Sequence, residues 1–215
     1  MSAKELGLHI RDLLVLKGIE TPFTPRGISP EATRKIIAGH FGQIIQALGL
    51  YDGDDSIEET PSRVGKMYAE EIFYGLDYAN FPKCTTVQNT MRYDEMVSTK
   101  CSIRSVCEHH FVPFIGHAHI AYIPGTKVLG LSKFNRIADF FARRPQIQER
   151  LTEQISATLQ YILETEDTAI VIKAQHMCVQ LRGVKDENSY TTTSKMSGKF
   201  RTVQSLREEF LSLTR

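Results

Sequence analysis

Apolar residues recur at helical spacing through the first part of the chain. Two series place them three or four positions apart, as on one face of a helix, at Leu6, Ile10, Leu13, Leu14 and Ile19 and at Ile36, Ile37, Phe41, Ile44, Ile45 and Leu48. Thr60 followed by Pro61 predicts a third helix with Thr60 as its N-cap, which runs to about Tyr74 and stops at Gly75. The pattern therefore predicts a helical N-terminal region at residues 1–80.

The pattern changes near residue 81. β-Branched and aromatic residues predict strands at residues 87–97, 111–123 and 168–182, and a short strand at 198–203. Apolar residues at helical spacing predict helices at residues 132–143, with Ser132 as the cap, at about 147–162 and at 206–213. Helices followed by strands, with helices inserted between them, predict an α+β fold whose second part, residues 81–215, is a compact domain.

Composition and charge restrict the function. The chain has 215 residues, which is enough to bury a hydrophobic core without disulfide bonds. Its formal net charge of +1 gives no reason to expect nucleic acid or an anionic membrane as a partner. The start of the sequence lacks the apolar core of a signal peptide, and no apolar run reaches the length of a membrane span, so we expect a cytoplasmic protein. Four cysteines in a chain of this length favour metal or catalytic roles over a disulfide framework.

Two short segments carry candidate chemistry. Cys107, His109 and His110 lie close together, and His176 and Cys178 follow about seventy residues later. Thiolate and imidazole are ligands that zinc prefers, and a spacing of three brings Cys107 and His110 together on a turn. With Cys178 these two residues would form a three-ligand site, which leaves His109 and His176 as a general acid and base.

The spacing alone leaves the purpose of this metal site open. Catalytic zinc usually has three protein ligands and a water, whereas structural zinc has four protein ligands. A fourth ligand from His109, His176 or Cys101 would make the site structural, and the spacing fits both kinds of site equally well.

The second segment lies on the strand predicted at residues 168–182. Side chains alternate along a strand, so His176, Cys178, Gln180 and Arg182 are expected on one face. Polar groups in such a row need partners if the face is covered, and a metal with an anionic ligand would supply them. A solvated edge strand is the alternative.

Phosphate binding is one interpretation of the helix that begins at Ser132. The free N–H groups and the dipole of a helix start attract anions, and Ser132, Lys133 and Arg136 add a hydroxyl and two positive charges. An ordinary cap with solvated charges is the alternative. Gln148 and Glu149 lie early in the next predicted helix, and from the sequence alone an exposed helix start, where an acid is favourable, is the preferred interpretation of both.

Several ordered motifs resemble those of the GTP cyclohydrolase I family. They are Cys-Glu-His-His-Phe at 107–111, Gly-Leu-Ser-Lys-Phe-Asn-Arg at 130–136, Arg-Pro-Gln-Ile-Gln-Glu-Arg at 144–150 and His-Met-Cys at 176–178, with further segments at 59–63 and 73–81. The resemblance extends from about Ile36 to the C-terminus. It implies the tunnelling fold, an antiparallel sheet with two helices packed on one side that assembles into barrels. It also implies a homo-oligomer, typically a decamer with active sites between subunits.

A reaction follows from the same resemblance. The family converts GTP and water into 7,8-dihydroneopterin triphosphate and formate, the first step of pterin and tetrahydrofolate synthesis. The implied cofactor is Zn²⁺, held by Cys107, His110 and Cys178, which lowers the pKa of a water that attacks C8 of guanine. His176 is then the proton donor to the ring nitrogen, and His109 is a second acid or base.

The resemblance also implies the residues that bind the substrate. Glu149, with Gln148, reads the guanine edge, where two adjacent N–H donors suit a carboxylate. The triphosphate is held by hydroxyl and basic side chains, namely Ser132, Lys133, Arg136, Arg182 and Arg63.

Two other functions fit the same residues. A non-catalytic nucleotide-binding module with structural zinc would have four metal ligands and would lose its stability on chelation. An enzyme that stops at a ring-opened or formylated intermediate would differ only in its product.

Overall fold

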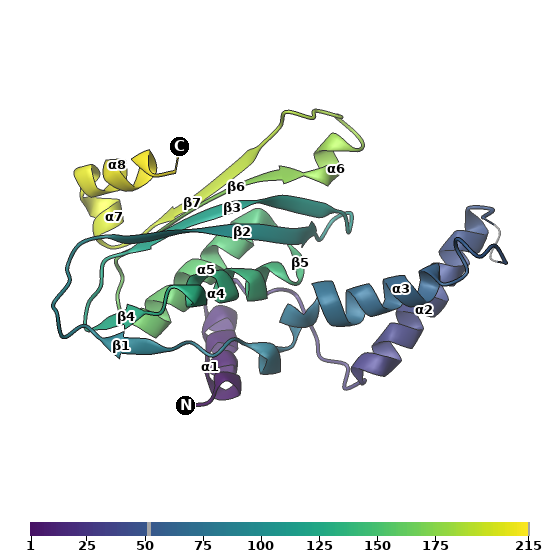
Figure 1. The fold of residues 1–215 in the computed structure, drawn as a ribbon, viewed down its shortest axis with the longest axis horizontal. Coiled ribbons are helices and arrows are strands. Elements are labelled where there is room, and N and C mark those ends of the chain that lie inside the picture. The colour runs from purple at the N-terminus through teal and green to yellow at the C-terminus, as the bar shows by residue number, and fades with distance from the viewer. Residues whose placement is uncertain (51–52, 215) are drawn as a thin grey trace.

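The computed structural model describes residues 1–50 and 53–214, so the predicted regions 1–80 and 81–215 are covered except for three residues that lie outside this description. Within the described residues, five strands form one sheet in the order β5-β2-β3-β6-β7 (Figure 1). The long strands pair antiparallel and are β2 (Val97–Cys107), β3 (Pro113–Tyr122), β6 (Thr168–His176) and β7 (Thr191–Met196). The short β5 (Pro145–Gln146) pairs in parallel with the end of β2, so the sheet is mixed.

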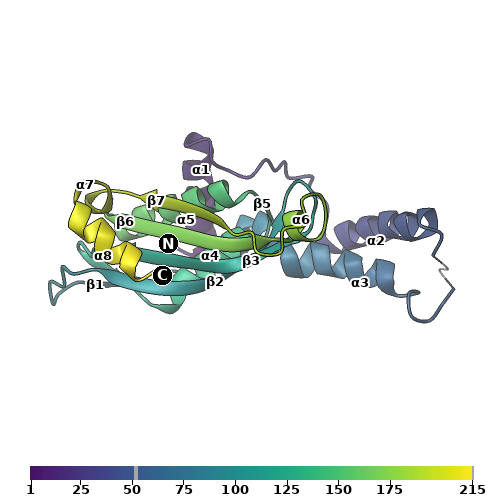
Figure 2. The same cartoon turned by 90° about the horizontal axis from the view of Figure 1, so that it is seen from above.

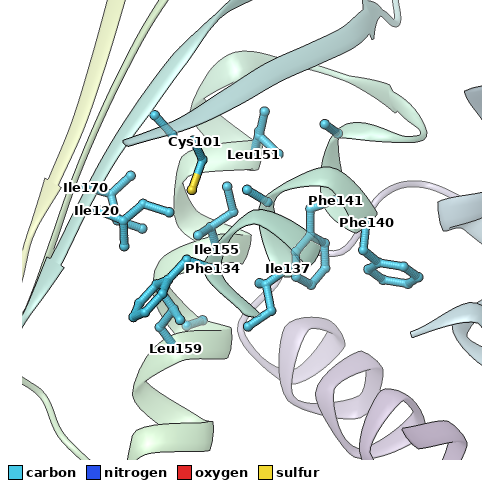
Figure 3. Packing of buried hydrophobic residues seen from close by; sticks show 14 of the residues in the cluster. Cys101, Ile120, Phe134, Ile137, Phe140, Phe141, Leu151, Ile155, Leu159 and Ile170 are labelled. Carbon is cyan, nitrogen blue, oxygen red and sulfur yellow. The ribbon is translucent and has the colours of Figure 1, made fainter. Parts of the chain in front are cut away.

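Alternation along the strands gives the sheet one apolar face. Cys101 lies opposite Ala118, which lies opposite Ile172, and all three side chains are buried. Helices α4 (Ser132–Ala142) and α5 (Gln148–Leu163) cover this face (Figure 1). Their apolar residues recur at helical spacing and meet the strands in one core, which contains Phe134, Ile137, Phe141, Leu151, Ile155 and Leu159 (Figure 3). The predicted α+β class and both of these helices are confirmed.

The opposite face of the sheet is covered at one end. Helices α7 (Lys199–Thr202) and α8 (Gln204–Ser212) lie over that end (Figure 2). Phe200 and Phe210 are fully buried there in a second, smaller apolar cluster with Ala121 and Ala169. The C-terminal helix therefore closes a part of the sheet that would otherwise expose apolar side chains.

The N-terminal region is helical, as predicted. Helix α1 (Ala3–Leu16) packs against α5, and helix α2 (Pro30–Ala47) pairs with α3 (Thr60–Lys66). The α2–α3 pair extends away from the sheet (Figure 1). In the described part of the chain, no helix combines the length and the apolar character that a membrane span requires.

Short elements connect the helical region to the sheet. A π-helix at Met67–Ile72 continues α3, and two 3-10 helices follow at Tyr74–Leu76 and Tyr78–Asn80. Strands β1 (Thr86–Gln88) and β4 (Lys127–Leu129) then form a separate two-stranded sheet.

Both predicted N-caps are wrong. Glu59 occupies the N-cap of α3 and Leu131 that of α4, so Thr60 and Ser132 lie inside their helices. A side-chain cap requires an extended backbone at the N-cap, whereas Glu59 and Leu131 are already helical. Each of the two helices thus begins one residue earlier than a cap at Thr60 or Ser132 would require.

Two predicted strands are also wrong. Residues 87–97 are extended only at their ends, because Asn89 bonds through its side chain to the N–H and the carbonyl of Tyr93 and closes a turn. Within the predicted strand at 198–203, residues 199–202 form α7 instead, with Gly198 as the N-cap at a φ of 53° and Phe200 buried.

A buried arginine joins the N-terminal region to the sheet. Arg144 lies directly before β5 and is 0% exposed. Its guanidinium donates to Glu20 Oε1 at 3.0 Å, to the Tyr78 hydroxyl at 3.4 Å and to the carbonyl of Gly75, and it lies 4.9 Å from the centre of the Phe140 ring. A buried charge is tolerated only when it is paired, so these contacts hold distant segments against β5.

Arg144→Met is expected to lower the free energy of unfolding by about 3–5 kcal/mol, because it leaves the largely buried Glu20 carboxylate without its partner. Urea unfolding at a fixed protein concentration measures this loss. Arg143→Met is the control, since its ion pair with Asp139 is partly exposed and contributes at most about 1 kcal/mol. Equal losses in the two variants would contradict the role assigned to Arg144.

Candidate metal centre and active site

The predicted metal ligands converge at one end of the sheet. Cys107 is the last residue of β2, His110 lies in the loop that follows, and Cys178 lies in the short helix α6 (Met177–Gln180) after β6. One donor atom from each residue lies within 4.8 Å of the others. Cys107 is buried, Cys178 is half-buried and His110 is exposed, so the group is open to solvent on one side.

Backbone hydrogen bonds hold the loop that carries His110. The N–H of Phe111 donates to the carbonyl of Cys107, and the N–H of Cys107 donates to the carbonyl of Val112, both at 2.9 Å. The N–H of Glu108 donates to the carbonyl of Gln146 in β5 at 3.0 Å. The loop is therefore closed on itself and held against β5.

The segment that carries Cys178 differs from its prediction. Strand β6 ends at His176, so the expected row of His176, Cys178, Gln180 and Arg182 on one strand face is wrong. The pair Phe114↔His176 is the last of the β3–β6 ladder, because β3 begins at Pro113, which has no N–H to donate. Without a partner strand the chain turns into α6, and this turn places Cys178 beside Cys107.

The donor set fits a divalent metal. Two thiols and an imidazole are zinc ligands, and atoms bound to one tetrahedral zinc lie about 3.5–4 Å apart. Burial raises the pKa of the Cys178 thiol, and the adjacent Cys107 thiol raises it further. If both thiols lose their protons, the two adjacent negative charges need a bound cation to stabilise them. A tetrahedral zinc held by three protein ligands would keep its fourth coordination position free.

His176 stands next to the metal group on a rigid support. Its ring stacks on Phe114 with 4.6 Å between the centroids, and its Nε2 lies 2.8 Å from Gln148 Oε1. Burial lowers the pKa of His176 and favours the neutral ring, while the charge of Glu149 acts in the opposite direction. Because an amide oxygen only accepts, Nε2 carries the proton and Nδ1 has the free lone pair.

Gln148 fixes that tautomer. It is the first residue of α5 and is buried, with its Nε2 3.0 Å from the carbonyls of Ile172 and Thr191 and 3.1 Å from Thr193 Oγ1. The amide nitrogen must face these acceptors, which turns the amide oxygen toward His176. The alternative of an exposed helix start is therefore wrong for Gln148, whereas Glu149 is exposed.

His109 and Arg182 border the group on its exposed side. His109 Nδ1 lies 3.8 Å from Cys107 Sγ, and Arg182 Nη1 lies 2.6 Å from His110 Nε2. A guanidinium only donates, so His110 accepts at Nε2 and has no second lone pair for a metal. This contact and metal binding by His110 exclude each other, and Arg182 must move when a metal binds.

Comparison with known proteins identifies the family. A family model described as GTP cyclohydrolase I matches residues 37–215. The chain belongs to the GTP cyclohydrolase I family. A protein named GTP cyclohydrolase 1 from Aeromonas hydrophila is 53% identical over 206 residues, which cover 95% of this chain and 94% of the relative. One of the same name from Enterobacter sp. (strain 638) is 50% identical and covers 99% and 97% of the two chains. The predicted family and the prediction of an enzyme are confirmed.

Among solved structures, the archaeosine synthase QueF-Like in the apo form aligns with a TM-score of 0.41 and 17% identity over 48% of this chain and 93% of that chain. A similarity of this size supports no conclusion about the fold.

Three residues that the family resemblance implies in substrate binding lie in the first half of α4, away from the metal group. Ser132 and Lys133 begin α4, about 15 Å of helix from the end that leads to β5 and Cys107, and Arg136 lies one turn further along the helix (Figure 1). Arg63 lies on α3, where it is exposed and paired with Glu59 at 2.6 Å. One chain therefore brings Arg182 to the metal group, but not the residues at the start of α4.

One contact at the site was missed by the sequence analysis. Glu108, between Cys107 and His109, forms an ion pair of 2.6 Å with Arg150 on α5. The two residues are 42 positions apart, so no helical or strand spacing relates them. Their places within two of the family motifs are the only signal in the sequence.

Gln148→Leu is expected to lower the free energy of unfolding by about 1–3 kcal/mol, because the buried partners of the amide lose their hydrogen bonds. Urea unfolding gives the difference. The exposed neighbour provides the control, since Glu149→Gln should change stability by no more than about 0.5 kcal/mol. An unchanged Gln148→Leu variant would show that these bonds do not hold the site together.

Proposed function

We propose that this protein is a zinc-dependent GTP cyclohydrolase that converts GTP and water into 7,8-dihydroneopterin triphosphate and formate, the first step of pterin and tetrahydrofolate synthesis. The convergence of Cys107, His110 and Cys178, with His176 two residues before the last ligand, is the observation that supports it most. The four cysteines are free, which agrees with a reducing compartment, and we assign the enzyme to the cytoplasm.

The three ligands define where the reaction takes place. A zinc ion held by them would supply a nucleophilic water with a pKa near neutrality, aimed at C8 of guanine. Arg182 has to leave His110 for the site to form, and its guanidinium is then free to bind an anionic substrate.

Two histidines handle the protons. Gln148 and Phe114 hold the ring of His176, which can take up a proton at Nδ1 and pass it to the purine ring nitrogen. His109 is exposed beside Cys107 and serves as a second acid or base.

The residues at the start of α5 divide the work of positioning. Glu149 is exposed, and its carboxylate can accept two adjacent N–H groups from the guanine edge. The amide of Gln148 is occupied by protein groups, so we assign Gln148 to orienting His176 and Glu149 to reading the base.

The positions of the proposed triphosphate-binding residues suggest that several copies of the chain assemble. Ser132, Lys133 and Arg136 offer a hydroxyl and two positive charges, but in one chain they lie a helix length away from the metal group. We infer that these residues and Arg63 serve the site of a neighbouring copy, while Arg182 serves its own. This arrangement agrees with the tunnelling fold and with a homodecamer that has active sites between its subunits.

Replacing a metal ligand should remove both metal and activity. We expect Cys107→Ser or Cys178→Ser to lose bound zinc and formate release from GTP, whereas His176→Ala keeps zinc and loses activity by about 10²–10⁴-fold. Metal analysis after dialysis and formate measurement separate the two outcomes. Cys84→Ser is the control, because Cys84 lies outside the metal group and should keep both properties.

Two results would overturn this function. Zinc-replete protein that releases no formate from GTP would do so directly. Loss of zinc in His176→Ala would instead indicate a four-ligand structural site in a nucleotide-binding module. Product analysis distinguishes an enzyme that stops at a ring-opened or formylated intermediate.

Active sites shared between subunits predict complementation. Lys133→Ala and His176→Ala are each expected to be inactive. Oligomers assembled together from equal amounts of the two variants should regain activity, because about one site in four then combines an intact Lys133 from one subunit with an intact His176 from another. Formate release from the mixture measures the effect.

The matched control mixes Lys133→Ala with Arg136→Ala. Both substitutions affect the same end of α4, so no site in this mixture is intact and activity should stay absent. If neither mixture regains formate release, each active site takes all of these residues from one chain.

A further inference from the structure

Phe111 has an unusual backbone conformation directly after the ligand His110. Its φ is 54°, in the left-handed region that bulky residues rarely occupy. The side chain is also 49% exposed, so burial alone does not hold it. Something specific must favour Phe111 in this conformation.

Aromatic contacts from the N-terminal region meet the Phe111 ring. Phe73 contacts it edge-on, with 5.6 Å between the centroids and 87° between the planes. Tyr68 lies 6.2 Å from Phe111 and stacks on Phe73 at 5.1 Å. Such distances and angles are favourable for aromatic pairs. We call Tyr68, Phe73 and Phe111 the aromatic anchor.

The π-helix at Met67–Ile72 explains why Tyr68 and Phe73 lie side by side. They are five positions apart, and the i→i+5 bonds of a π-helix place such residues one above the other. An α-helix would align residues three and four positions apart instead. The change of helix type after Lys66 thus builds a two-ring surface for Phe111 to contact.

We propose that the aromatic anchor positions the loop of residues 107–112, so that the zinc affinity of the site depends on side chains of the N-terminal helical region. This inference rests on the proposed zinc role of Cys107, His110 and Cys178. His110 itself is exposed and cannot keep its contact with Arg182 once it binds a metal. The restraint on its backbone then comes from the neighbouring Phe111.

The anchor acts through the loop's own hydrogen bonds. The left-handed turn at Phe111 directs the chain so that the carbonyl of Val112 accepts from the N–H of Cys107, which closes the loop that carries the two ligands. Without the ring contacts, a non-glycine residue at this position favours other backbone conformations, in which that bond is lost. Phe111 is thus a positioning residue that does not itself bind the metal.

Zinc affinity, measured by competition with a chromophoric chelator, tests the proposal. Phe111→Ala and Phe73→Ala should each weaken zinc binding on the order of tenfold, as changes around metal ligands commonly do. Ile115→Ala is the control, because Ile115 is also 49% exposed and lies on β3 close to the loop. It should bind zinc as the unchanged protein does.

Phe111→Gly separates the ring from the backbone. Glycine adopts the left-handed conformation without strain, so an effect of backbone strain alone would leave zinc affinity unchanged or improve it. Glycine also populates other conformations, so the loss of the ring contacts should still weaken zinc binding in Phe111→Gly, though less than in Phe111→Ala. The double variant Phe73→Ala/Phe111→Ala should bind zinc about as weakly as the weaker-binding single variant, because both substitutions remove the same ring contact.

Each result decides between the possibilities. If Phe73→Ala or Phe111→Gly binds zinc as tightly as the unsubstituted protein, the role of the anchor is overturned. This holds even when the unsubstituted protein binds zinc through Cys178. Failure of the unchanged protein to bind zinc overturns the proposed function instead. Circular dichroism and thermal melting confirm that each variant is folded, and Phe73→Leu replaces Phe73→Ala if that variant is not.

Discussion

The position of the site depends on the contacts of one fully buried group, the guanidinium of Arg144. Its charge is held by Glu20, Tyr78 and the carbonyl of Gly75, and its Nε has no hydrogen-bond partner among the described residues. A charge removed from water in this way is stable only while its partners keep their places. Because Arg144 precedes β5, and β5 pairs with the end of β2 at Cys107, the same contact places the metal loop relative to the N-terminal region.

The segment that leads from β5 into the first turn of α5 extends this placement to both ligand-bearing segments. The carbonyl of Gln146 accepts from Glu108, Arg150 pairs with Glu108, and Gln148 bonds to His176. Three residues within five positions thus touch the metal loop and the end of β6, which lie far apart in the sequence. A rigid helix start therefore sets the relation between the metal group and its neighbouring histidine, which two flexible loops could not do.

Sequence patterns predicted what local interactions determine. The apolar spacing of α4 and α5 located the core helices, and residue type with motif located Cys107, His110 and Cys178. The end of β6 was missed because it depends on Pro113 in another strand, and the contact of Arg144 with Glu20 spans 124 positions. Neither follows from a local period, since each depends on a partner that only the folded chain supplies.

The two edges of the sheet give the proposed assembly a geometric basis. In the described part of the chain, β7 ends the sheet on one side, while β5 covers only the last two residues of β2 on the other. Strand β2 runs toward the metal group and β7 runs away from it, so β2 of one copy and β7 of the next could pair antiparallel and continue the alternation. Open edges of this length favour such pairing. Cys107, at the end of β2, would then lie at the junction of two copies, beside the start of the neighbour's β7.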